Sequence, residues 1–141
     1  EIEEVIANSS AMINQIMTYN DHKKYTTALV TLNKKNIEDW IKKKNMAKTD
    51  QVLDKIKEEI FSFKKKNEFK NKFPEKWLPA QFQIAEEAFS EENKMINSTM
   101  KMVRFAILNA YQDRIDLMYG PNAQQNSTDK NKQVLGKMFK L

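Results

Sequence analysis

The sequence predicts an all-α protein, an elongated antiparallel bundle of four main helices plus a short C-terminal helix, in one domain spanning residues 1–141. Three observations favour this fold. Only two glycines and three prolines occur, so the turns and positive-φ positions that multi-stranded sheets need are scarce. Good helix formers such as Lys, Glu, Gln, Leu and Ala are abundant. Apolar residues also recur at helical spacing along most of the chain.

The spacing of apolar residues in the first half of the chain predicts three helices. Residues 2–19 carry one broad apolar face and form the first helix. A second helix spans 23–45, with Asp21 as an N-cap and the lysines before Asn45 complementing the negative end of the helix dipole. The alternative is one helix that runs through Asn20. A third helix, 50–68, begins after the capping pair Thr49-Asp50.

Two prolines end this helical series and define a loop at 67–79. The loop is rich in aromatic residues, so we expect it to fold back over an end of the core.

The longest predicted helix spans 79–119 and is closed by Gly120-Pro121. Its length would be roughly 60 Å, which overhangs a compact bundle. Either it bends or breaks near Ser90, or the first two helices are continuous and match it; we favour an elongated bundle without a full break. Residues 121–129 are polar and predict a mobile connection, followed by a short helix at 130–140.

Charge and composition narrow the function classes. The net charge is +5, and all but two of the 24 basic residues are lysines. Because Arg is the usual bidentate reader of phosphate and guanine, this balance is weak evidence for nucleic-acid binding. The absence of cysteine excludes disulfides, thiolate metal sites and cysteine nucleophiles. The chain begins at Glu1 and not at Met, so we expect a removed upstream segment and favour export (periplasmic, lipid-anchored or secreted) over the cytoplasm.

Four residues stand out as a possible interaction site or pocket. Glu92, Asp113 and Arg114 fall on or beside the apolar stripe of the 79–119 helix, where charge is costly unless it is paired. Trp77 lies in the proline-bounded loop. The simpler interpretation of the three charges is a solvated or paired edge. Residues with the spacing of a catalytic, metal or cofactor site are not recognised, so we expect no catalytic residue, metal or cofactor.

The sequence therefore favours a non-enzymatic helical-bundle domain that acts by binding, as the mature part of an exported or surface-anchored protein. Its partner would be an unidentified macromolecule or a second copy of the chain. One alternative is a basic nucleic-acid-associated protein that uses the Lys-rich region 34–76, where 14 lysines face 8 acidic residues. A second alternative is a small-ligand sensor bundle with a pocket lined by Asp113 and Arg114.

Overall fold

A three-stranded mixed sheet lies at the centre of the computed structural model, which describes residues 1–45 and 47–141. Its strands are β1 (Ile13–Tyr19), β2 (Thr27–Leu32) and β3 (Gln81–Ile84), in the order β1-β2-β3. Strand β2 pairs antiparallel with β1 and parallel with β3. Because β2 is central and both faces of the sheet are covered, all of its residues are buried.

Among the described residues, six helices and two short 3-10 turns surround the sheet. The helices are α1 (Ile2–Asn8), α2 (Lys34–Lys44), α3 (Thr49–Ile60), α4 (Arg104–Ala110), α5 (Gln112–Leu117) and α6 (Ala123–Phe139). The 3-10 turns are η1 (Ser62–Lys65) and η2 (Glu75–Trp77). Helices α2 and α3 lie in the connection between the parallel strands β2 and β3, which cannot be joined by a hairpin.

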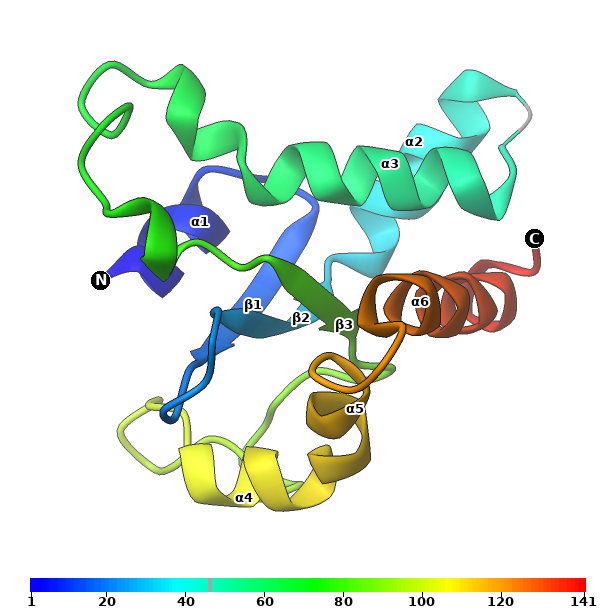
Figure 1. The fold of residues 1–141 in the computed structure, drawn as a ribbon. Helices are drawn as coiled ribbons and strands as arrows, with labels where there is room; N and C mark the ends of the chain where they lie inside the picture. Colours follow the sequence, from blue (N-terminus) through cyan, green and yellow to red (C-terminus); the bar gives the residue numbers. More distant parts are fainter. Residues whose placement is uncertain (46) are drawn as a thin grey trace.

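The two faces of the sheet belong to two hydrophobic clusters. On one face, Ala28, Val30 and Leu32 of β2 pack with residues of α1, α3 and α6. On the other face, Leu29 packs with Ile107 of α4 and with residues of α5. Figure 1 shows this layering, with α3 and α6 on one side of the strands and α4 and α5 on the other. Among the described residues, none of the helices is long and apolar enough to span a membrane.

The prediction of an all-α bundle of four main helices is wrong. Residues 2–19 form a short helix and then strand β1, and residues 23–45 hold strand β2 before α2. The stretch 79–119 begins with β3, continues as an irregular segment at 85–103, and ends in the short helices α4 and α5. The stretch 121–129, expected to be a mobile connection, lies mostly within α6. The helix predicted for 50–68 ends at Ile60.

The strands could not be predicted from the sequence, for physical reasons. A short strand that is buried on both faces, such as β2, shows no alternation of polar and apolar residues, so its apolar run matches a buried helix equally well. The shortage of glycine was also wrongly taken as evidence against a sheet, because residues such as His22 and Asn122 adopt positive φ angles in place of glycine.

Helix α6 is joined to the sheet by buried Asn131 as well as by its apolar residues. The side-chain amide of Asn131 donates to the carbonyl of Phe82 at 2.9 Å and accepts from the backbone N–H of Ile84 at 2.9 Å. These two bonds satisfy the outer edge of β3, which would otherwise leave backbone groups without partners. A polar residue at this position therefore anchors the helix to the sheet.

Candidate functional site

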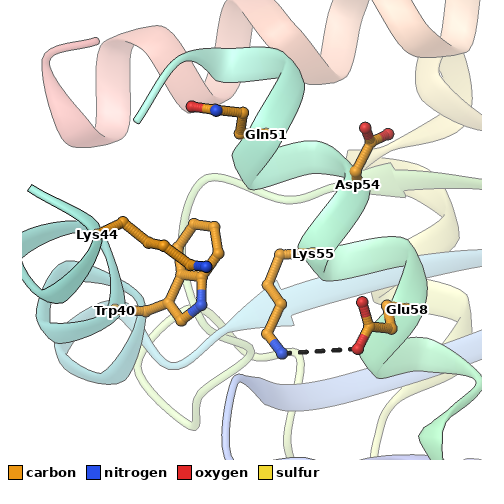
Figure 2. Close-up of a pocket in the computed structure, with 6 residues that line it drawn as sticks. All are labelled: Trp40, Lys44, Gln51, Asp54, Lys55 and Glu58. Carbon is orange, nitrogen blue, oxygen red and sulfur yellow. Dashed lines mark ion pairs between the residues drawn. The ribbon is translucent and has the colours of Figure 1, made fainter. Parts of the chain in front are cut away.

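An open groove of about 470 Å³ lies between α2 and α3. Figure 2 shows Trp40 and Lys44 of α2 on one side of it and Gln51, Asp54, Lys55 and Glu58 of α3 on the other. Lys55 Nζ lies 3.8 Å from a carboxylate oxygen of Glu58, and Lys44 Nζ lies 5.7 Å from the Trp40 ring centroid. All six lining residues are exposed or partly exposed. Because none of these residues is buried, this groove lacks the convergent buried polar groups of a ligand site.

A second hollow, of about 510 Å³, lies between α1, β1 and the segment 96–104. Buried Ile16 and Ile96 contribute apolar surface to it. Its charged lining residues come from segments far apart in the sequence and are Glu1, Glu3, Glu4, Lys101 and Arg104. Unlike the groove between α2 and α3, this hollow combines both signs of charge with buried apolar residues, so we take it as the candidate site.

The irregular segment 85–103, which follows β3, forms one wall of this hollow. Gln15 of β1 holds the first part of this segment in place. The Gln15 side-chain amide donates to the carbonyl of Phe89 at 2.9 Å, and its oxygen accepts from the backbone N–H of Phe89 at 2.9 Å. The same oxygen also accepts from the hydroxyl of Thr31 at 2.8 Å. The segment is therefore fixed to the sheet although it has no regular structure.

A tight turn closes the segment at residues 96–102. Ile96 and Met102 form an antiparallel bridge, and the backbone N–H of Asn97 donates to the carbonyl of Lys101 at 2.9 Å. Inside the turn, the side-chain oxygen of Asn97 accepts from the backbone N–H of Thr99 at 3.0 Å, from its hydroxyl at 2.7 Å and from the backbone N–H of Lys101 at 3.0 Å. Met100 adopts a positive φ of 65°. The turn is therefore held in one conformation by side-chain bonds that stand in for regular structure.

The turn and the start of α4 carry an exposed cation and two exposed apolar side chains. Met100 is 74% exposed and Phe105 is 76% exposed, and Lys101 is exposed as well. In the part of the chain that the structure describes, Lys101 makes no ion pair. These side chains are accessible to another part of a protein or to a ligand.

Arg104 secures the base of the turn to α1. Its guanidinium donates to both carboxylate oxygens of Glu3, one of them at 3.0 Å. Hydrogen bonding to Glu3 raises the pKa of Arg104 above its ordinary value. The Glu3 carboxylate also accepts from the backbone N–H of Thr18 at 2.6 Å. Arg104 is thus paired with Glu3, whereas Lys101, the other cation that lines the hollow, makes no ion pair within the described residues.

The residues singled out from the sequence lie apart from this hollow. Arg114 is buried and donates to the side-chain oxygen of Gln83 at 2.7 Å, to Glu86 at 2.6 Å and to the carbonyl of Ile84. Asp113 and Glu92 are exposed, and Trp77 lies in η2. The backbone N–H of Arg114 donates to the Asp113 carboxylate at 2.9 Å, and within the described ranges no other hydrogen bond or ion pair joins these four residues. Their role as one site stays a prediction.

Lys101 was missed because it lay inside the helix predicted for 79–119. One signal could have revealed its turn: Asn97-Ser98-Thr99 are three consecutive residues that favour turns by bonding their own backbone. The heptad spacing of the flanking apolar residues concealed that signal.

Replacing Asn97 by alanine should loosen the turn, because three hydrogen bonds lose their acceptor. We expect the unfolding free energy to fall by about 1 kcal/mol and the backbone N–H of Lys101 to exchange faster with solvent. Hydrogen exchange and urea denaturation of the 141-residue chain measure both effects. Ser98→Ala serves as the control because Ser98 is exposed in the same turn. Unchanged protection of Lys101 in the Asn97 variant would show that the turn is held by other contacts.

Comparison with known proteins gives similarity in structure alone. No family model and no curated protein matches the sequence. The fold is similar to the adenylation domain of a carboxylate reductase from Mycobacterium chelonae, with a TM-score of 0.67 and 18% identity over 84% of this chain. It is also similar to an adenylation and carrier-protein didomain of a carboxylic acid reductase from Segniliparus rugosus, solved with AMP, with a TM-score of 0.68 and 17% identity over 88% of this chain.

A third similar structure is the adenylation domain of the Segniliparus rugosus enzyme with AMP and a co-purified carboxylic acid, with a TM-score of 0.64 and 18% identity over 84% of this chain. The matches cover 17%, 16% and 17% of those chains, so this chain spans about one sixth of their length.

These similarities contradict the predicted function. The solved structures that share the fold are domains of enzymes, so the expectation of a non-enzymatic helical-bundle binding domain is wrong. The same finding overturns the alternatives of a nucleic-acid-associated protein and of a small-ligand sensor bundle. The predicted partner, export and single-domain organisation stay predictions.

Proposed function

We propose that this chain forms part of an enzyme that activates a carboxylic acid by adenylation, and that Lys101 is the residue it contributes to the reacting groups. The fold supports this proposal, because similar structures were solved with AMP and with a carboxylic acid. The observation that carries it is the fixed turn at 96–102, which holds exposed Lys101, a residue without an ion pair among the described residues, next to exposed Met100 and four residues before exposed Phe105 in the chain.

The proposed reaction joins a carboxylic acid to the adenylate part of ATP. A carboxylate oxygen attacks the α-phosphorus, and the bond from that phosphorus to the oxygen bridging to the β-phosphate breaks. Pyrophosphate leaves with the electron pair, and an acyl adenylate remains. Both reactants are anions, so a fixed ammonium group that touches the carboxylate and the α-phosphate lowers their repulsion and stabilises the charge of the transition state. Lys101 has the charge and the exposure for this role.

The apolar neighbours of Lys101 fit the same role. The chain spans about one sixth of the similar adenylation proteins, so in this proposal the groups that hold the adenine and the tail of the acid come from outside residues 1–141. Met100 and Phe105 then dock against that remainder and exclude water around the lysine. Exclusion of water strengthens the interaction between the ammonium group and the phosphate.

ATP–pyrophosphate exchange tests this function. The intact polypeptide in which the chain occurs is incubated with ATP, labelled pyrophosphate and a panel of aliphatic and aromatic carboxylic acids. We expect label to enter ATP only when one of the acids is present, and not with the corresponding amide, which lacks the nucleophilic oxygen anion. An exchange that needs no acid, or no exchange with any member of the panel, would contradict the proposal.

Replacing Phe105 by serine should separate docking from folding. Because Phe105 is 76% exposed, we expect the unfolding free energy of the 141-residue chain to stay within about 0.5 kcal/mol. Acid-dependent exchange by the intact polypeptide should fall roughly tenfold, as for the loss of an aromatic anchor at an interface. Leu141→Ser is the matched control, since Leu141 is 41% exposed but follows α6 and lies outside the turn at 96–102. Equal exchange rates in the Phe105 variant and the wild type would remove the docking role.

A further inference from the structure

A second feature lies at the corner of the fold beyond the end of α3. We call the segment 61–78 the basic aromatic corner. It contains six lysines against two glutamates, a net charge of +4, together with five aromatic residues. The lysines are Lys64, Lys65, Lys66, Lys70, Lys72 and Lys76, and the aromatic residues are Phe61, Phe63, Phe69, Phe73 and Trp77. The proposed adenylation chemistry makes no use of this corner.

The aromatic residues of the corner form a platform that rests on the core. Phe63 is buried, and Phe73 packs edge-on against it with ring centroids 6.0 Å apart. Trp77 follows on the outside, 6.2 Å from Phe73, and is 48% exposed. A hollow of about 330 Å³ lies beside this stack and is bordered by Phe69 and Leu78. The exposed tryptophan is therefore held in place by packing.

Several lysines around the platform carry charge that the chain does not neutralise. Lys66, Lys70 and Lys76 are exposed, and among the described residues none of them makes an ion pair. Lys64 lies 4.0 Å from Glu75, and Lys72 pairs with Glu1 at 2.6 Å. The corner therefore combines unpaired positive charge with a half-exposed indole ring.

We propose that the basic aromatic corner binds the surface of a membrane that contains anionic lipids. Trp is favoured at the boundary between lipid and water because its ring is apolar while its N–H needs a polar partner. Lysines near an anionic surface add roughly equal increments of attraction and bury their apolar stems while the ammonium groups reach the headgroups. The corner supplies both kinds of group side by side.

The details of the corner favour a lipid surface over single-stranded nucleic acid. All six of its cations are lysines, whereas arginine is favoured for bidentate phosphate contacts. Bases also need free aromatic faces for stacking. Lys72 Nζ lies 5.5 Å from the Phe69 ring centroid and 5.7 Å from that of Phe73, so a lysine of the chain itself already covers these rings.

The position of the corner leaves the candidate site accessible. In Figure 1 the segment that follows α3 lies at the top, beside α1, whereas α4 and the turn before it lie at the bottom. The basic aromatic corner and the turn that carries Lys101 therefore lie on different parts of the molecule, although Lys72 of the corner pairs with Glu1, which lines the hollow. The membrane proposal does not rest on the proposed reaction.

The two tryptophans of the chain provide a direct test with the 141-residue chain. Trp40→Phe leaves Trp77 as the sole tryptophan, and Trp77→Phe leaves Trp40, which lies in the groove between α2 and α3 (Figure 2). On addition of vesicles of phosphatidylcholine and phosphatidylglycerol, we expect the emission of the Trp40→Phe variant to shift to the blue and that of the Trp77→Phe variant to stay unchanged. No shift from Trp77 would overturn the proposal.

A charge comparison tests whether the position of the lysines matters. The triple variant K66Q/K70Q/K76Q should bind these vesicles on the order of 100-fold more weakly, because each lysine contributes roughly fivefold. The control K35Q/K43Q/K137Q removes the same charge from exposed lysines of α2 and α6, and its affinity for the vesicles should fall much less. Equal losses would mean that net charge alone drives binding. Binding to single-stranded RNA without binding to vesicles would also contradict the proposal.

Discussion

Replacing Lys101 by alanine is expected to lower acid-dependent ATP–pyrophosphate exchange by at least about 100-fold, the typical effect of removing one preorganised group that stabilises transition-state charge. The effect should appear in kcat more than in KM, because the ammonium group acts mainly on charge that develops during the reaction. The fold should be unaffected, since the Lys101 side chain forms no ion pair or hydrogen bond within the described residues. Steady-state exchange kinetics of the intact polypeptide measure the change.

Two controls make this result specific to Lys101. Lys35→Ala removes an exposed lysine from α2 and should leave exchange unchanged. Lys101→Arg keeps the charge but changes the shape of the head group, so we expect it to recover only part of the activity. Wild-type exchange by the alanine variant would show that Lys101 does not touch the reacting groups.

Replacing Arg114 by methionine should give the largest loss of stability. The Arg114 side chain is 6% exposed and donates to Gln83, Ile84 and Glu86. Methionine fills a similar space but donates nothing, so the buried oxygens of Gln83 and Ile84 lose a partner. We expect the unfolding free energy of the 141-residue chain to fall by about 3–5 kcal/mol, as measured by urea denaturation.

Glu86→Gln is the matched control for this buried network. The Glu86 side chain is 56% exposed, and glutamine still offers an oxygen to Arg114, so the loss should stay below about 1 kcal/mol. A loss of less than about 1 kcal/mol in the Arg114 variant would show that water or a rearranged neighbour satisfies Gln83 and Ile84. The two variants together therefore separate the buried bonds from the exposed ion pair.

The sequence carried good information about α2 and α3 and poor information about the sheet. Asn33 caps α2 through its side chain, and the apolar residues of α3 recur at helical spacing, so local signals specify both helices. Strand β2 has no such signal, because its burial on both faces depends on elements that come later in the chain. Strand β3 spans only Gln81–Ile84, too short for a pattern to emerge.

The candidate site was hidden for a related reason. Its turn is organised by local bonds of Asn97, and the segment that leads to it is anchored by the contact of Phe89 with Gln15, which joins residues 74 positions apart. Propensity and periodicity describe neighbours along the chain, and they do not register such contacts. Arg114 differs in this respect. Its place on an apolar stripe singled it out in the sequence, and its side chain is buried in the structure.

Isotope transfer from the acid to AMP tests the proposed function most directly. The intact polypeptide is given ATP and a carboxylic acid labelled with ¹⁸O in both carboxylate oxygens, and the acyl adenylate is then cleaved with hydroxylamine, which attacks the acyl carbon. Because an oxygen of the acid forms the bond to the α-phosphorus, we predict that the released AMP carries one ¹⁸O atom, as measured by mass spectrometry. AMP without label, or label found in inorganic phosphate instead, would contradict activation by adenylation.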